Sequence, residues 1–272
     1  MKIPPQNSVL YLVGTVHNDP DGNYRLRTLL DQLSPHRIVL ELSSDRAQEF
    51  LSHTLEDRMR EHEATIASWK KQGLVLTPEQ RERSLQLARF KNKDYGFELD
   101  ASLAYQQKHP AASIIYGDLP LPSTQESAAF VAGLRETFGM EKNSPLTADM
   151  QTNILQGLQS SIENYMYTLR QGVEENYRNA LDSSAALTEM AHNPDLFEAL
   201  ALGLSPEARE SFRFIVNPER NTSLARSIRE GYTPQQTTIS VMGIAHLYLV
   251  ASLLEDLHPE LVCLHEVPIP QT

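Results

Sequence analysis

Short apolar runs of β-forming residues alternate along the chain with longer stretches of helical periodicity. Each run ends at a glycine or a polar residue, as expected of a strand buried within a sheet. Because strands separated by helices favour crossover connections, this pattern predicts an α/β fold with a mostly parallel central sheet. The predicted strands cover residues 8–13, 37–42, 112–116, 237–242 and 261–265.

Helix-forming stretches fill the spaces between these runs. Thr77-Pro78-Glu79-Gln80 has the residues of an N-terminal capping box. No low-complexity linker divides the chain, so we expect a single α/β domain over 1–272 with a large helical insertion or cap over 121–215. An apolar-rich helix within that insertion, 147–181, could supply a homodimer face. The predicted helices cover or begin at 47–72, Pro78, 147–181, Pro206 and 218–231.

A strand followed by Gly-x-x-His occurs twice. Gly14-Thr15-Val16-His17 and Gly243-Ile244-Ala245-His246 each follow an apolar strand and lead into a helical segment. Each segment ends in a proline turn, and another predicted strand follows, with Glu41 in the first copy and His265 at the matching place in the second. The repeat predicts two related halves, each of the form strand–GxxH–helix–strand.

The repeated motifs fall where parallel sheets bind ligands, beyond the carboxyl ends of the strands. Glycine lets the chain turn sharply out of each strand, so we expect His17 and His246 to face a shared cleft. Glu41 and Asp118, each at the end of a predicted strand, would join them. Two imidazoles with one or two carboxylates suit a divalent transition metal ion, and they suit a metal-free general acid and base equally well.

Each of these residues also has a purely structural interpretation. A carboxylate buried without a partner is costly, so Glu41 could instead form an ion pair with Arg46 or Arg220. Asp118 could be an ordinary turn residue. His17 could be bonded to backbone in a loop. His246 could be packed in the core, and His265 could be exposed at a sheet edge.

The acidic composition narrows the classes of function. The 272 residues carry 24 Lys+Arg against 35 Asp+Glu, and the formal net charge of −11 disfavours nucleic-acid binding and docking on anionic lipid. Cys263 is the single cysteine, so neither an intrachain disulfide nor a Cys-rich zinc site is expected. No signal-peptide pattern occurs, and the most apolar stretch, 239–254, is too short to span a bilayer. We therefore expect a cytoplasmic protein without a membrane segment.

Five motifs, taken in order along the chain, resemble the TraB/PrgY family. That family is grouped with GumN-like and TIKI-type proteins in a superfamily that includes erythromycin esterases and the haem-binding lipoprotein ChaN. The chain departs from the family pattern at Leu119, where an arginine is common. The motifs that carry the resemblance are Tyr11–His17, Ile38–Leu42 with Arg46, Tyr116-Gly117-Asp118, Glu219-Arg220-Asn221 with Leu224-Ala225, and Val241–Leu247.

The resemblance implies two related halves around a central cleft. It also implies a metal-dependent hydrolase, because the TIKI-type relatives are peptidases that need a divalent cation such as manganese or cobalt. Carried over to this chain, His17 and His246 would be metal or catalytic histidines and Glu41 their acidic partner. Arg220 and Asn221 would line the cleft.

The leading hypothesis is a metal-assisted hydrolase acting on a peptide or on another small-molecule amide or ester. A manganese, cobalt, zinc or iron ion, held by His17 and His246 with Glu41 or Asp118, would activate a water molecule. Glu41 would be the general base if it is not a ligand, and Arg220 would stabilise the oxyanion. Without a metal, His17 would be the base, oriented by Glu41. The alternative is a protein that binds a peptide or a haem in the same cleft without turnover.

Overall fold

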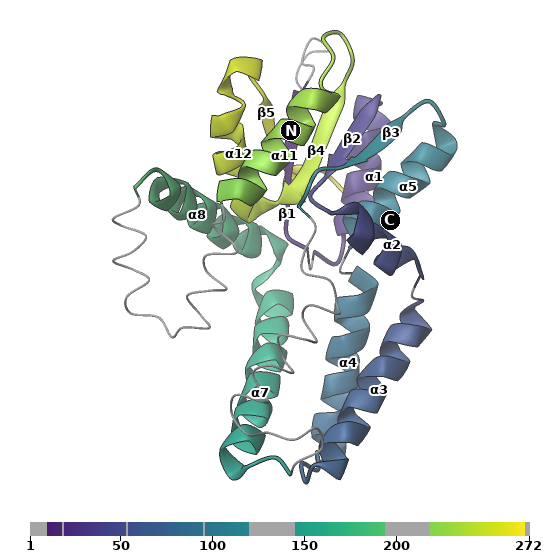
Figure 1. Ribbon diagram of the computed structural model, residues 1–272, viewed down its shortest axis with the longest axis vertical. Helices are drawn as coiled ribbons and strands as arrows, with labels where there is room; N and C mark the ends of the chain where they lie inside the picture. The colour runs from purple at the N-terminus through teal and green to yellow at the C-terminus, as the bar shows by residue number, and fades with distance from the viewer. Residues whose placement is uncertain are drawn as a thin grey trace. The chain divides into compact units, whose positions relative to one another are not determined.

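The computed structural model describes residues 10–17, 19–52, 54–94, 96–119, 145–193 and 218–269 of the chain (Figure 1). The chain divides into two compact units. The first contains the described residues of Met1–Ser44, Gly96–Leu119 and Val173–Thr272. The second contains those of Asp45–Tyr95 and Pro120–Gly172. The predicted insertion over 121–215 is described only at 145–193.

The first unit is built on a five-stranded sheet with the order β3-β2-β4-β1-β5, in which every neighbouring pair is parallel. The α/β fold with a mostly parallel sheet is therefore confirmed. The last predicted strand was too long, because the chain leaves the sheet after Cys263 and forms a 3-10 turn that includes His265. The strands are β1 Leu10–Thr15, β2 Arg37–Leu40, β3 Ser113–Tyr116, β4 Thr238–Gly243 and β5 Glu260–Cys263.

Helices cover both faces of this sheet. The connection from β1 to β2 passes β4 in one direction, whereas the connection from β4 to β5 passes β1 in the other. Crossovers of the same right-handed sense that run in opposite directions place their helices on opposite faces. Accordingly, α1 packs against α5, and α11 packs against α12 on the other side (Figure 1). These helices are α1 Gly22–Leu33, α5 Phe97–Lys108, α11 Pro218–Gly231 and α12 Leu247–Leu253.

The central strands form the core of the first unit. Leu12 and Val13 of β1 and Ile239 of β4 are completely buried, as expected of strands that are covered on both faces. The short strands β2 and β3 end at Leu40 and Tyr116, and their next residues lead directly into the candidate site. The unit also contains α8 Val173–His192 and the 3-10 turns η1 Ile244–His246, η2 Glu255–Leu257 and η3 Leu264–Glu266.

The second unit is helical among its described residues. The predicted helix over 47–72 is two helices, because Thr54 caps the second one with a side-chain bond to the Asp57 amide. The capping box predicted at Thr77 is present, since Thr77 Oγ1 accepts from the Gln80 amide and Gln80 Oε1 accepts from the Thr77 amide. The helices are α2 Ser44–Ser52, α3 Leu55–Lys71, α4 Pro78–Asp94 and α7 Ala148–Gln171.

The predicted helix over 147–181 also breaks in two. Gly172 separates α7 from α8 with φ 84° and ψ 160°, a conformation that is essentially restricted to glycine. The predicted helix beginning at Pro206 lies outside the described residues. Among the helices that the structure describes, none combines the length and the apolar character needed to cross a membrane.

Candidate functional site

The carboxyl ends of four neighbouring strands carry the polar residues that the sequence singles out. Thr15 and Gly243 end the adjacent strands β1 and β4, where they lie opposite each other. Glu41 follows β2 directly, and its amide donates to the Val241 carbonyl at 3.0 Å. Asp118 follows β3 by two residues. The strand order therefore gathers residues that are more than 200 positions apart at one edge of the sheet.

Glu41 lies at the centre of this group. Its side chain is 6% exposed, and Oε2 accepts a 2.6 Å hydrogen bond from the Gly243 amide. Its other oxygen, Oε1, accepts from Arg220 Nη2 at 2.5 Å and lies 3.2 Å from His246 Nε2. The ion pair with Arg220, one of the two partners considered from the sequence, is thus present. The buried carboxylate has both a counter-charge and hydrogen-bond donors.

Asp118 is held by the same arginine. Arg220 Nε lies 2.9 Å from Asp118 Oδ1, Arg220 Nη2 lies 2.8 Å from Oδ2, and the Asp118 side chain is 1% exposed. The Leu119 amide donates to Oδ1 as well. Arg220 lies in the first turn of α11 and so reaches the ends of β2 and β3 at once. In this structure Asp118 therefore braces Arg220 rather than facing the histidines.

His246 is fixed from its other side by Asn221. The ring Nδ1 donates to Asn221 Oδ1 at 2.8 Å, and both residues are buried. Burial lowers the pKa of His246, although the charge of Glu41 opposes this effect. A neutral ring that carries its proton on Nδ1 presents the lone pair of Nε2 to the Glu41 oxygen. Two such lone pairs at 3.2 Å repel each other unless Nε2 carries a proton or a metal ion lies between them.

His17 is oriented by Glu98, a residue that the sequence analysis did not identify. His17 Nδ1 lies 2.8 Å from Glu98 Oε1, and the Thr15 hydroxyl donates to the same oxygen at 2.7 Å. Desolvation alone would lower the pKa of His17, but the charge and hydrogen bond of Glu98, together with the charge of Glu41, raise it to about 9. Burial alone would raise the pKa of Glu98, but His17 lowers it. The two form a charged pair in which the His17 side chain is 41% exposed.

Glu98 reaches the site because α5 begins very close to α1. A Cβ placed on Gly22 would lie 2.5 Å from the Phe97 ring, so the glycine allows the first residue of α5 to pack there. Glu98 is the next residue and extends towards β1. Its carboxylate replaces Glu41 as the group that orients His17.

Gly243 separates His17 from Glu41. A Cβ on Gly243 would lie 3.0 Å from His17 Nε2 and 3.3 Å from Glu41 Oε2. Both atoms therefore approach the same point, and only a residue without a side chain leaves that space open. The two histidines flank one carboxylate, with His246 at Oε1 and His17 on the side of Oε2.

The donor atoms fit a divalent transition metal ion in type. Two imidazoles and a carboxylate are ligands that such ions take, and each imidazole is held at Nδ1 by an oxygen, as is usual for ligating histidines. The contact between His246 Nε2 and Glu41 Oε1 can be bridged by a metal ion or by a proton on the ring. Within the described ranges, however, no three His, Cys, Asp or Glu side chains converge into a ready-made metal cluster. His17 is the member that stands apart.

His265 does not join this group. Its ring packs against Tyr177 with centroids 4.5 Å apart, and burial lowers its pKa. Cys263 ends β5 next to it, and burial raises the pKa of its thiol to about 11, which makes it a poor nucleophile. Neither side chain takes part in the contacts around Glu41.

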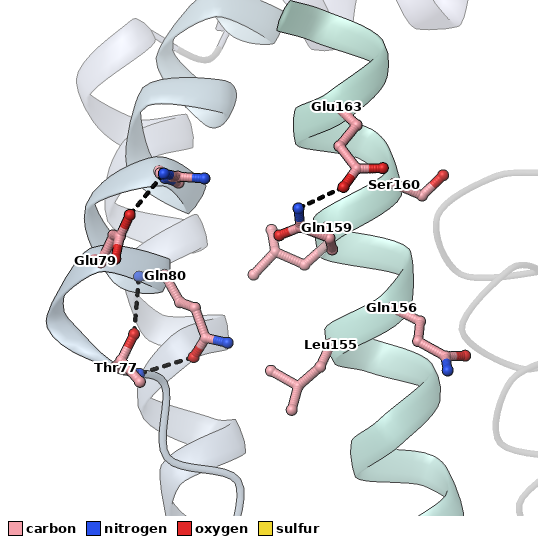
Figure 2. A pocket seen from close by; sticks show the side chains of 10 residues that line it. Thr77, Glu79, Gln80, Leu155, Gln156, Gln159, Ser160 and Glu163 are labelled. Carbon is pink, nitrogen blue, oxygen red and sulfur yellow. Dashed lines mark hydrogen bonds and ion pairs between the residues drawn. The ribbon is translucent and has the colours of Figure 1, made fainter.

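A groove of about 540 Å³ lies between α4 and α7 in the second unit. Polar residues of its lining pair along their own helices: Arg83 donates to Glu79 at 2.6 Å, and Gln159 donates to Glu163 at 2.6 Å (Figure 2). Leu155 contributes an apolar wall. The lining residues thus form no convergent catalytic group, and the candidate site is the one around Glu41.

Comparison of the chain with protein-family models, with curated proteins and with solved structures gives no match. The resemblance to the TraB/PrgY family therefore stays a prediction, and the function has to be argued from the site.

Proposed function

We propose that the chain is a hydrolase of amide or ester bonds, assisted by a divalent metal ion, with its centre at His17, His246 and Glu41. One observation carries the proposal: His246 Nε2 lies 3.2 Å from Glu41 Oε1, and His17 Nε2 and Glu41 Oε2 approach the same point beside Gly243, 3.0 Å and 3.3 Å from where its Cβ would lie. Each histidine also has its Nδ1 held by an oxygen of another side chain. Such a fixed tautomer and ring orientation is what a ligating or catalytic imidazole requires.

His17, His246 and Glu41 would hold the ion, in agreement with the donor types at the site. When bound, a manganese, cobalt, zinc or iron ion supplies a water of lowered pKa and polarises the carbonyl of the substrate. Asp118 takes a supporting role in this proposal, because Arg220 and the Leu119 amide already use its oxygens.

The remaining residues position the three central groups. Arg220 neutralises part of the charge of Glu41 and Asp118, which allows two carboxylates to lie buried side by side. Asn221 fixes the His246 ring, and Glu98 fixes the His17 ring. The Gly243 amide, which donates to Glu41 Oε2, keeps that carboxylate turned towards the histidines. If Glu41 acts as the general base, the oxygen that takes the proton would be Oε2, on the side of His17, because Oε1 is bonded to Arg220.

The two-half arrangement is part of the same proposal. β1 and β4 lie side by side in the sheet, and each carries a Gly-x-x-His motif at its carboxyl end. β1 crosses over β4 to reach β2, and β4 crosses over β1 in the opposite direction to reach β5. This topology is what two related strand–GxxH–helix–strand halves would produce around an axis between β1 and β4.

A metal-free hydrolase is the second candidate, and the His17–Glu98 pair favours it. With its pKa raised to about 9, His17 carries a proton at neutral pH. It would therefore act as a general acid that protonates the leaving group, not as a resting-state base. Chelator resistance of the activity separates this candidate from the first.

The test is metal content and turnover measured on the same preparations. Wild-type protein is loaded separately with manganese, cobalt, zinc and iron and is then dialysed, and bound metal is measured by mass spectrometry. About one ion per chain is expected for at least one metal, and it should be lost in His17→Ala and in His246→Ala. His192→Ala is the matched control, because that histidine is exposed and bonds only to the Thr188 carbonyl of its own helix.

Turnover is then assayed against peptide and ester libraries. New termini or released acid that disappear in Glu41→Gln and on chelation support the metal-assisted hydrolase. Activity that survives chelation supports the metal-free candidate. A protein that binds haem or peptide at the site and returns the ligand intact is a binding protein, and that outcome overturns both enzymatic proposals.

A further inference from the structure

One helix, α8, contacts the chain beside both Gly-x-x-His histidines. Near its N-terminus the Tyr177 hydroxyl donates to Asp19 Oδ2 at 3.1 Å. Two turns later the Ser184 hydroxyl donates to the Ala245 carbonyl at 3.2 Å. Helix α8 also packs against η1, the turn that contains His246.

Helix α8 is bonded to equivalent positions of the repeat. Tyr177 bonds Asp19, which lies two residues after His17, and Ser184 accepts from the amide of Tyr248, which lies two residues after His246. Each hydroxyl therefore holds the loop from which one of the two histidine side chains extends.

Tyr177 and Ser184 are well suited to act as fixed anchors. Both are completely buried, so water does not compete for their hydroxyls. Burial raises the pKa of Tyr177, which keeps the phenol protonated as a donor. Because they are seven residues apart, they lie on one face of α8, about 10 Å apart along its axis.

Each anchor is part of a wider set of bonds in its own loop. At the first, Asp19 Oδ1 accepts from the Asp21 amide, and the Asp19 amide donates to the Val16 carbonyl at 2.8 Å, closing the turn that carries His17. At the second, the Tyr248 amide donates to Ser184 Oγ at 3.4 Å, just beyond His246. Ser184 is thus bonded to the chain on both sides of His246, and Tyr177 is bonded to the chain just after His17.

We propose that α8 is a clamp that sets the separation of His17 and His246, with Tyr177 and Ser184 as its two positioning residues. The functional consequence rests on the proposed hydrolase site, because the clamp would hold the two imidazoles at the spacing that a shared metal ion needs. The clamp itself does not depend on a bound metal, so it is tested on the metal-free protein.

Amide hydrogen exchange, followed by NMR on the chelator-treated full chain, tests the clamp alone. Tyr177→Phe and Ser184→Ala each remove one oxygen atom. Loss of one buried hydrogen bond should speed exchange about tenfold at the Asp19 amide in Tyr177→Phe and at the Tyr248 amide in Ser184→Ala. Each effect should be confined to its own loop.

Two variants serve as matched controls. Ser183→Ala removes an exposed hydroxyl of α8 that bonds only to the Asn179 carbonyl of the same helix, and Tyr24→Phe removes the hydroxyl of a tyrosine that is 45% exposed on α1. Both should leave the exchange rates of the two loops unchanged. Thermal unfolding of all four variants checks that they are folded.

Metal binding then tests the consequence for the site. The visible absorption spectrum of bound cobalt should change in both clamp variants, and cobalt affinity should fall about tenfold in each. Unchanged loop exchange in Tyr177→Phe and Ser184→Ala would overturn the clamp, whatever the metal results. Failure of the wild type to bind any metal would overturn the metal-assisted function instead, and the exchange rates would still decide the clamp.

Discussion

Replacing Gly243 with alanine places one methyl group at the centre of the candidate site. The new Cβ would lie 3.0 Å from His17 Nε2 and 3.3 Å from Glu41 Oε2. The backbone φ of Gly243 is −56°, so an alanine fits the backbone there without strain. The substitution therefore tests the space between the two side chains and not the turn.

The expected magnitude follows from these contacts. Carbon atoms pack best about 3.5–4.0 Å from their neighbours, so His17 and Glu41 must each move by a few tenths of an ångström. Both are tethered, His17 by Glu98 and Glu41 by Arg220, and overpacking of this kind costs about 1 kcal/mol of folding stability. The methyl group also fills the point that both side chains approach. We therefore expect metal affinity to fall by about a hundredfold, with hydrolysis reduced at least as much.

Gly231→Ala is the matched control. Its Cβ would meet Ile115 Cδ1 at 2.9 Å, a similar degree of crowding, but at the opposite end of α11 from Arg220. It should lose a similar amount of stability in urea denaturation and keep metal affinity and turnover. Wild-type metal affinity and turnover in Gly243→Ala would refute the assignment of His17 and Glu41 to one centre.

Three further predictions concern ionisable side chains, two at the site and one outside it. In chelator-treated protein, Glu98→Gln should bring the pKa of His17 from about 9 down towards 6.5, measured by NMR titration of the ring. Because the raised pKa contributes stability below pH 6.5 that is lost as the pH rises through 9, the wild-type melting temperature should fall across that interval more than that of the variant. Arg220→Met should cost roughly 3–5 kcal/mol in urea denaturation, since it leaves two buried carboxylates without a counter-charge. Cys263, with its pKa near 11, should react with iodoacetamide at pH 8 far more slowly in the native than in the unfolded protein.

The sheet was predictable because its signals are local. An apolar run that stops at a glycine marks the end of a buried strand to within a residue, since β4 ends at Gly243 and β1 ends one residue after Gly14. The requirement that Glu41 find a partner was also predictable, since an unpaired buried carboxylate is costly. The choice of Arg220 over Arg46 depended on where α11 packs, which no local pattern determines.

Glu98 could not have been found in this way. It joins His17 across 81 positions, and an acidic residue in the first turn of a helix is common for reasons of helix electrostatics alone. The nearest sequence signal is that Phe97 and Leu99, on either side of it, are apolar and prove to be buried. A carboxylate between two buried residues at a helix start is a useful pattern to look for.

The anchors on α8 were hidden for a different reason. The helix that the sequence predicts over 147–181 runs through Gly172 and places Tyr177 in the same helix as residues of the second unit. A single glycine inside a helical pattern is often tolerated, and only its positive φ shows that the helix ends there. Once α8 is separate, the seven-residue spacing of Tyr177 and Ser184 becomes visible.

The order of the strands explains why neither half of the chain could form the site alone. β2, which leads to Glu41, lies beside β4 and not beside β1, so the first-half carboxylate accepts its hydrogen bond from Gly243 of the second motif. The register of the β1–β4 pair has a similar effect. It places Thr15 opposite Gly243, and the Thr15 hydroxyl donates to Glu98, the residue that orients His17. The pairing of β1 with β4 therefore brings the chain segments of both histidines to one place, although Glu98 and Asn221 orient the rings. A change that weakens this pairing should disorganise both imidazoles together, whereas a change at Glu98 or Asn221 should affect only one.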